Sequence, residues 1–120
     1  MPPRTTQFQK GCYYHLYNRG VNRQSIFLDH QDFADFLLRI KRYCEQYAVQ
    51  PIAYCLMPNH FHFLVRQDGE YRAGLFIQNA SNGYAQLFNR RHQRQGALFQ
   101  GRFRAELVDE GAYLHHLCRT

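Results

Sequence analysis

Two histidines, His60 and His62, are separated by one apolar residue inside a run rich in strand-forming residues, 54–65. Successive side chains of a β-strand point to opposite faces, so the two imidazoles would project side by side. Phe61 and Phe63 would point to the other face and pack. Neutral imidazole is the commonest metal ligand among side chains, and two on one strand pre-set a geometry. The spacing therefore predicts a metal site, although a lone His-x-His also occurs in strands that bind nothing.

The four cysteines do not complete a common zinc pattern. They are scattered, without a Cys-x-x-Cys, at positions Cys12, Cys44, Cys55 and Cys118. A zinc site that joins Cys44 or Cys55 to the two histidines is an alternative, but its ligand spacings match no common pattern. Scattered thiols of this kind are typical of a reducing compartment, so we expect a cytoplasmic protein with free thiols.

The charge composition favours a nucleic-acid partner. The 120 residues carry 15 Lys and Arg against 9 Asp and Glu, which gives a net charge of +6, and all but two of the basic residues are Arg. A planar guanidinium binds phosphate through two hydrogen bonds and stacks on bases. This bias indicates nucleic acid before a membrane or an acidic protein. No apolar run reaches the roughly 18 residues of a spanning helix, and the N-terminus lacks a signal-peptide apolar region.

The apolar pattern predicts seven elements that would position these groups. We expect strands near residues 12–17, 52–57, 60–66 and 97–108, and helices that follow Asp29, span about 72–92 and follow Asp109. The first six elements spell the split βαβ arrangement of a ferredoxin-like domain. The predicted fold class is therefore α+β, with a four-stranded antiparallel sheet, two helices on one face and a C-terminal helix. No linker interrupts residues 1–120, so we expect one domain.

Basic and amide side chains gather in three segments. The candidates for nucleic-acid contacts are Asn18, Arg19 and Arg23 in an expected turn, Arg90 and Arg91 at a helix end, and Arg102 and Arg104 on the last strand. Each group also has a structural explanation, because solvated turns carry charges and cations are favourable at a helix C-terminus. Phe99 and Phe103 could stack on bases, although core packing is the better expectation for at least one of them.

These segments resemble the single-tyrosine HUH transposases, and especially the REP-associated tyrosine transposases. The matching segments are residues 14–23, 54–65, 98–104 and 113–114, so the resemblance covers nearly the whole chain in the expected order. It implies a ferredoxin-like fold with His60 and His62 as ligands of a divalent metal, Mg or Mn. It also implies that a tyrosine on the last helix attacks a phosphate of single-stranded DNA. That step leaves a 5′-phosphotyrosine link and a free 3′-hydroxyl, which later reverses the reaction on another strand.

The nucleophile is the point where this sequence departs from the family. The family pattern places the tyrosine after a segment like residues 117–119, and a polar side chain about one turn later completes the metal site. Here Thr120 stands at or just before that position and is the last residue given. Either the chain is truncated just short of its nucleophile or Thr120 replaces it. Tyr113 is the one tyrosine left on that expected helix, where its place in an apolar stripe favours packing over attack.

The sequence thus predicts a metal-dependent nuclease and strand transferase that nicks and rejoins single-stranded DNA, with a hairpin near the cleaved bond. One alternative is a non-catalytic module that binds single-stranded nucleic acid, a use to which ferredoxin-like sheets with exposed aromatic residues are widely put. Another is an inactive regulator of its own element, which a missing tyrosine would favour. The resembling family includes dimers and monomers, so a homodimer stays open.

Overall fold

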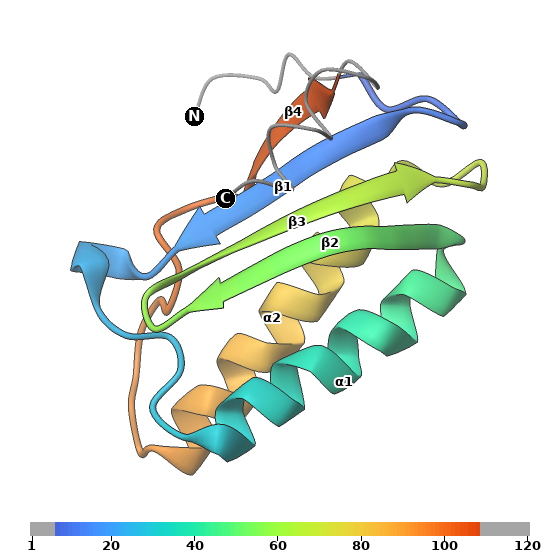
Figure 1. The fold of residues 1–120 in the computed structure, drawn as a ribbon. Coiled ribbons are helices and arrows are strands. Elements are labelled where there is room, and N and C mark those ends of the chain that lie inside the picture. Colours follow the sequence, from blue (N-terminus) through green and yellow to red (C-terminus); the bar gives the residue numbers. More distant parts are fainter. Residues whose placement is uncertain (1–6, 109–120) are drawn as a thin grey trace.

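The computed structural model describes residues 7–108, and its elements follow the predicted order (Figure 1). They are β1 (Tyr13–Arg19), the short 3-10 turn η1 (Val21–Arg23), α1 (His30–Gln46), β2 (Val49–Met57), β3 (His60–Gln67), α2 (Gly74–Arg91) and β4 (Arg104–Val108). None of the helices in this part of the chain is long and apolar enough to cross a bilayer.

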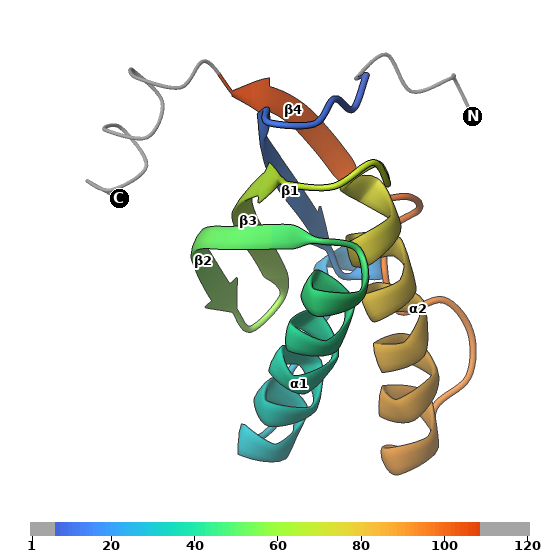
Figure 2. The ribbon, with the colours of Figure 1, turned by 90° about the vertical axis from the view of Figure 1, so that its right-hand side faces the viewer.

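The four strands form an antiparallel sheet in the order β2-β3-β1-β4, so β3 and β1 lie in its centre. Both helices cover the same face of the sheet, as the end-on view in Figure 2 shows. This arrangement confirms the predicted α+β, ferredoxin-like fold. The predicted C-terminal helix falls in residues 109–120, outside the described residues.

Helix α1 begins and packs as its sequence pattern predicts. The side chain of Asp29 accepts a hydrogen bond of 2.9 Å from the backbone nitrogen of Asp32 and so caps the first turn. Phe36, Ile40 and Cys44 recur every four residues and are buried. Because that spacing keeps them on one face of a helix, they form a continuous stripe against the sheet.

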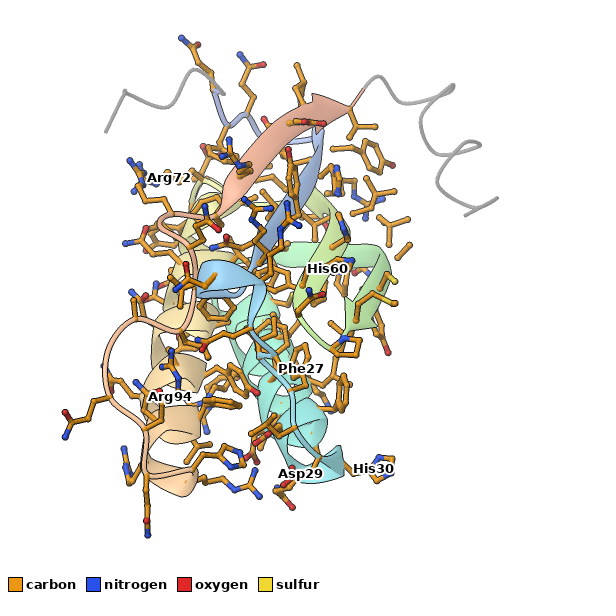
Figure 3. The ribbon with its side chains drawn as sticks, turned by 90° about the vertical axis from the view of Figure 1, so that its left-hand side faces the viewer. Phe27, Asp29, His30, His60, Arg72 and Arg94 are labelled. Carbon is orange, nitrogen blue, oxygen red and sulfur yellow. The ribbon has the colours of Figure 1, made fainter. Side chains whose placement is uncertain are left out.

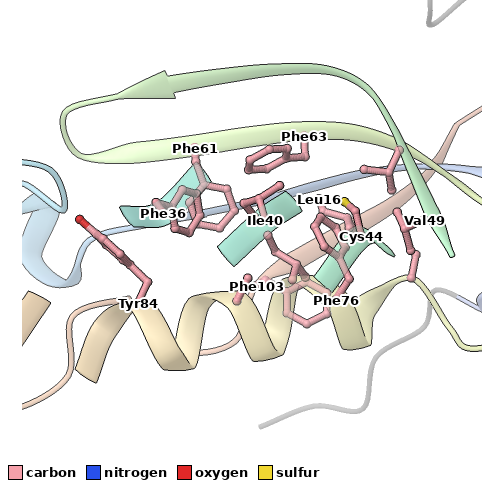
Figure 4. Packing of buried hydrophobic residues seen from close by; sticks show 14 of the residues in the cluster. Leu16, Phe36, Ile40, Cys44, Val49, Phe61, Phe63, Phe76, Tyr84 and Phe103 are labelled. Carbon is pink, nitrogen blue, oxygen red and sulfur yellow. The ribbon is translucent and has the colours of Figure 1, made fainter. Parts of the chain in front are cut away.

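Strand β3 divides its side chains between the core and the opposite face of the sheet. Phe61 and Phe63 are buried and point toward the helices, where their rings lie 5.2 Å from Phe36 and 6.2 Å from Phe76 respectively (Figure 4). These aromatic contacts fix the strand against both helices. The alternate positions of β3, which include His60 and His62, therefore face away from the helices, as the period of two predicts.

Three strand boundaries differ from the prediction, and the first is that β2 begins at Val49, before the expected residue 52. The expected strand at 97–108 is a strand only over β4, and residues 97–103 run as a loop with one isolated bridge between Phe99 and Gly20. The backbone at Gly96 and Gly101 is left-handed, with φ of 89° and 70°, which interrupts an extended chain. Arg102 and Arg104 consequently do not share one strand. Strand β1, by contrast, continues through the predicted turn to Arg19.

The two phenylalanines proposed for base stacking both pack in the protein. Phe103 is buried in the core, and its ring would clash with any side chain at Gly74. Phe99 is partly buried and stands edge-on to Phe61 at a centroid distance of 5.8 Å. Core packing therefore accounts for both rings.

Candidate functional site

A pocket of about 580 Å³ lies over the ends of β1 and β3, on the face of the sheet that the helices leave open. Its lining residues are Tyr17, Asn18, Arg19, Arg23, Asn59, His60, His62, Gln100 and Arg104. Six of them are residues that the sequence singled out: Asn18, Arg19, Arg23, His60, His62 and Arg104. The pocket thus brings two imidazoles, three guanidinium groups and several amides together in one polar hollow.

The strand register explains why these side chains meet. Across the β1–β3 pair, Arg19 lies opposite His60 and Tyr17 lies opposite His62. On the other side of β1, Tyr17 lies opposite Arg104 of β4. Directly opposed residues on neighbouring antiparallel strands bring their Cβ atoms to about 5 Å on the same face. Arg104, Tyr17 and His62 therefore form a row across the sheet, with Arg19 and His60 in a parallel row beside it.

The loop after β1 is held close to the pocket by backbone hydrogen bonds. Gly20 donates to the carbonyl oxygen of Asn59 at 2.9 Å, and Val21 donates to that of Leu98 at 2.9 Å. A Cβ at Gly20 would overlap the backbone oxygen of Gln24, so only glycine allows this turn to close. The same turn carries Arg23 to the rim of the pocket.

His60 has a hydrogen-bond partner that fixes its tautomer. Its Nδ1 lies 2.8 Å from the side-chain oxygen of Asn59, whose amide nitrogen donates to the carbonyl oxygen of Arg23 at 3.4 Å. An amide oxygen can only accept, so Nδ1 of His60 carries the hydrogen and Nε2 keeps a lone pair. His60 and His62 rings stand edge to face with centroids 5.2 Å apart. Two nearby imidazoles, of which His60 can present the lone pair of its Nε2, are a donor set that fits a divalent metal.

His62 is surrounded by groups that keep it neutral. Its Nδ1 lies 2.8 Å from Nε2 of His15, which is buried beside it. Burial lowers the pKa of His62, and the neighbouring charges of His15 and His60 lower it further. Burial also lowers the pKa of His15, against the opposing effect of Glu106. Neutral imidazole is the form that can bind a metal, so this environment favours the predicted ligand role.

Five residues in and beside the pocket were missed from the sequence: His15, Tyr17, Asn59, Gln100 and Glu106. The Tyr17 hydroxyl donates to Oε1 of Glu106 at 3.0 Å, and its ring stacks on His15 at 4.5 Å and on His62 at 5.5 Å. Nδ1 of His15 lies 3.8 Å from Oε2 of Glu106. The usable signal was the shared parity of His15 and Tyr17 on β1. Glu106 could be joined to them only through the β1–β4 register, which the sequence does not contain.

Arg102 lies at a second hollow, next to the first. This hollow has a volume of about 500 Å³, and its lining residues are Asn18, Gln78, Ser81, Asn82, Ala85, Ala97, Leu98, Phe99, Gly101, Arg102 and Phe103. Asn18 lines both hollows and donates from its amide nitrogen to the carbonyl oxygen of Gly101 at 3.2 Å. Gln78 and Asn82, two amides on α2, line the same space as Arg102.

Arg90 and Arg91 lie apart from both pockets, at the C-terminal end of α2. Arg90 is exposed, whereas Arg91 is engaged in ion pairs with Asp29, at 3.2 Å, and with the buried carboxylate of Asp32. Their role as DNA contacts stays a prediction, and for Arg91 the structure supplies a local function. It joins the start of α1 to the end of α2.

Within residues 7–108, one group of three side chains has potential metal-binding atoms within 4.8 Å of one another: Asp29, Asp32 and His92. Nε2 of His92 lies 2.9 Å from Oδ2 of Asp32, and Arg91 contacts both carboxylates. A guanidinium therefore already supplies the positive charge that a metal would bring. Figure 3 shows Asp29 at the start of α1, far along the molecule from His60, so this group belongs to the joint between the helices.

The fold and the pocket together define a basic ferredoxin-like domain whose sheet carries a histidine pair beside several arginines. The family described as "Transposase IS200 like" matches residues 8–118, so the chain belongs to this transposase family. The recognition made from the motifs is thereby confirmed. Among curated proteins, none matches the sequence significantly.

Several solved structures share the fold, and two of them illustrate the likeness. One is a REP-associated tyrosine transposase bound to a REP hairpin, with a TM-score of 0.71 and 16% identity over 97% of this chain and 68% of that one. The other is a protein assigned as a transposase from Deinococcus radiodurans R1, with a TM-score of 0.68 and 15% identity over 98% of this chain and 95% of that one. At such identities the likeness shows the fold. Tyr113 and Thr120, the positions considered for the nucleophile, lie outside the described residues.

Proposed function

We propose that this chain nicks and rejoins single-stranded DNA beside a hairpin, as the catalytic domain of a transposase. The proposal rests on the observation that His60, His62 and three arginines line one pocket. The family supports a part in transposition. One structural relative is bound to a REP hairpin, which makes hairpin DNA the first substrate to test.

The two histidines would hold a divalent metal, Mg or Mn, through their Nε2 atoms. When bound, such an ion supplies positive charge that polarises a phosphate and stabilises the charge that develops on its oxygens. Both ions take most of their ligands from oxygen, so water and phosphate would complete the coordination. Asn59 contributes by orienting the ring of His60 through the 2.8 Å hydrogen bond.

The arginines around the pocket would bind the DNA backbone. Arg19 is held in place because its Nε donates to the side-chain oxygen of Gln100 at 3.0 Å, and its carbonyl oxygen accepts from the backbone of Gln100 at 2.9 Å. An oriented guanidinium binds phosphate through paired hydrogen bonds at a smaller entropic cost than a mobile one. Arg23 and Arg104 approach the same pocket from the loop after β1 and from β4.

The second hollow would receive an unpaired base next to the bound phosphates. Gln78 and Asn82 offer amides, which donate to and accept from base edges. Arg102 adds a cation at the mouth of the same hollow. Bases that flank a hairpin are unpaired, so their edges are available for this kind of recognition.

The nucleophile would be a tyrosine that follows Thr120, with Tyr113 as the alternative. Its oxygen attacks the phosphorus, the bond from phosphorus to the 3′-oxygen breaks, and that oxygen takes a proton to become a free hydroxyl. The covalent 5′-phosphotyrosine link keeps the energy of the broken bond, so the reverse attack by a 3′-hydroxyl rejoins DNA without ATP.

The test is cleavage of an end-labelled hairpin by a chain extended past Thr120, with Mn²⁺ or Mg²⁺ present. We expect nicking in the parent chain and its loss in His60→Ala and in His62→Ala. His30→Ala is the matched control, because His30 is exposed at the start of α1 and lies outside the pocket. Normal cleavage by both pocket variants would contradict the assignment of the site.

A binding module or an inactive regulator is the second candidate, because arginines line both hollows and the hollows share Asn18. Such a protein would bind the hairpin equally well in EDTA, whereas the nuclease needs the metal for cleavage. In either case Arg104→Ala should lower the salt dependence of binding by about one phosphate contact.

A further inference from the structure

We propose that His15 and Glu106 form a relay of polar contacts that holds His62 in the tautomer whose Nε2 is free to bind a metal. The inference rests on the proposed metal role of the histidine pair and adds two positioning residues to it. Neither residue lines the pocket. They would act through His62, not on the DNA.

The relay follows from the negative charge of Glu106 beside His15 and from the direction of the hydrogen bond between His15 and His62. A carboxylate only accepts, so Glu106, whose Oε2 lies 3.8 Å from Nδ1 of His15, favours a hydrogen on that nitrogen. A neutral His15 that is protonated on Nδ1 has its lone pair on Nε2. That nitrogen lies 2.8 Å from Nδ1 of His62 and must therefore accept from it. His62 then carries its hydrogen on Nδ1, and its lone pair is on Nε2.

The three side chains are held in this order by the sheet. Glu106 lies directly opposite His15 in the β1–β4 register, and His62 lies diagonally across β1–β3, opposite Tyr17. Tyr17 fixes both ends of the relay, because its hydroxyl donates to Glu106 at 3.0 Å and its ring stacks on His62. His15 is buried between them, with its ring 5.1 Å from that of His62 and nearly parallel to it. The imidazole of His15 thus has little freedom to turn.

With the relay, His60 and His62 adopt the same tautomer through different hydrogen-bond partners. Asn59 holds the hydrogen of His60 on Nδ1, and His15 does the same for His62. In the neutral form of each ring, the lone pair is then on Nε2 before any ion arrives. Partners of this kind are expected to change metal affinity by about 10- to 100-fold when they are removed.

The experiment uses the full chain without metal and reads the tautomer of His62 from ¹⁵N shifts of its two ring nitrogens, at a mildly alkaline pH. We expect a hydrogen on Nδ1 in the parent chain. His15→Phe removes the acceptor and keeps the ring volume, so the signal should move toward the Nε2-protonated form. His15→Gln offers an amide oxygen to the same Nδ1 and should restore the parent signal. Glu106→Leu should give the same shift as His15→Phe, and His30→Phe should give none.

A second measurement is the dissociation constant of Mn²⁺ alone. It should rise about 10- to 100-fold in His15→Phe and largely recover in His15→Gln. A parent signal in His15→Phe or in Glu106→Leu overturns the relay. A His15→Gln variant that behaves like His15→Phe also overturns it, because the restored acceptor would then have no effect on the tautomer of His62. If the parent chain binds no Mn²⁺ at all, the proposed metal role fails, while the shifts still decide the relay.

Discussion

The joint between the two helices is the part of the structure with the sharpest prediction for stability. Asp32 is fully buried, and its carboxylate accepts hydrogen bonds from the backbone of Leu28 at 2.9 Å, from Arg91 and from His92. Replacing Asp32 by Ala removes all of these acceptors at once. The variant leaves the backbone of Leu28 without its partner and weakens the joint between the start of α1 and the end of α2, where Arg91 keeps its ion pair with Asp29.

The size of the effect can be worked from those contacts. Removing one member of a buried ion pair costs about 3 to 5 kcal/mol when the other member stays buried. The Arg91 side chain is 31% exposed and can regain water, so we expect about 2 to 3 kcal/mol for Asp32→Ala. For a domain of this size, that loss corresponds to a fall in the thermal midpoint of roughly 8 to 12 °C.

The assay is thermal unfolding followed by circular dichroism, with Glu45→Ala as the control because Glu45 is exposed on the same helix. The control should change the midpoint little.

Addition of Mn²⁺ should not raise the midpoint of a His60→Ala, His62→Ala double variant, because Arg91 already neutralises the acidic pair. A midpoint in Asp32→Ala equal to that of the control would refute the reasoning. So would a rise with Mn²⁺ in the double variant that disappears when Asp32 is also replaced.

Two further predictions concern the sheet and the loop beside it. Burial lowers the pKa of His15 and His62, so the unfolded chain takes up more protons than the folded chain as the pH falls through about 6.5. The free energy of unfolding should therefore decrease as the pH is lowered through that value. A His15→Gln, His62→Gln variant should lose that slope, and an unchanged slope would contradict the assignment. Gly20→Ala should lower both the thermal midpoint and hairpin affinity, because its Cβ meets the backbone of Gln24 and displaces Arg23. Gly83→Ala is the control, because the added Cβ meets only the flexible end of the Arg39 side chain. Alanine in place of glycine should stabilise this helix by about 1 kcal/mol. Equal effects of the two substitutions would count against the close approach at Gly20.

Local patterns predicted the fold well because the core is built from strictly periodic residues. The four-residue spacing of Phe36, Ile40 and Cys44 and the alternation around Phe61 and Phe63 each define one buried face. Those patterns also predicted that His60 and His62 share the opposite face. The error at 97–103 has a different origin. An apolar, strand-like segment became a loop because two glycines turn the backbone and Phe99 and Phe103 pack against other elements.

The rest of the site could not be predicted because it depends on contacts between distant segments. His15 and Glu106 meet only through strand pairing, which one sequence does not specify. Arg91 was a reasonable DNA contact by type and position, and its ion pairs with Asp29 and Asp32 follow from the way α1 and α2 pack. Residue type therefore predicted candidates, and tertiary packing decided which of them meet.

The two-sided composition of β3 protects the protein against mispairing. A slip of one residue against β1 would turn the histidines inward among the aromatic rings and leave Phe61 and Phe63 in water. The slip would cost free energy on both faces of the sheet. The imidazoles would be buried without hydrogen-bond partners, and the phenylalanine rings would be exposed to water. A chain that pairs β3 with β1 in the native register therefore also places His60 and His62 on the face away from the helices. Selection for the correct register preserves the position of the two imidazoles.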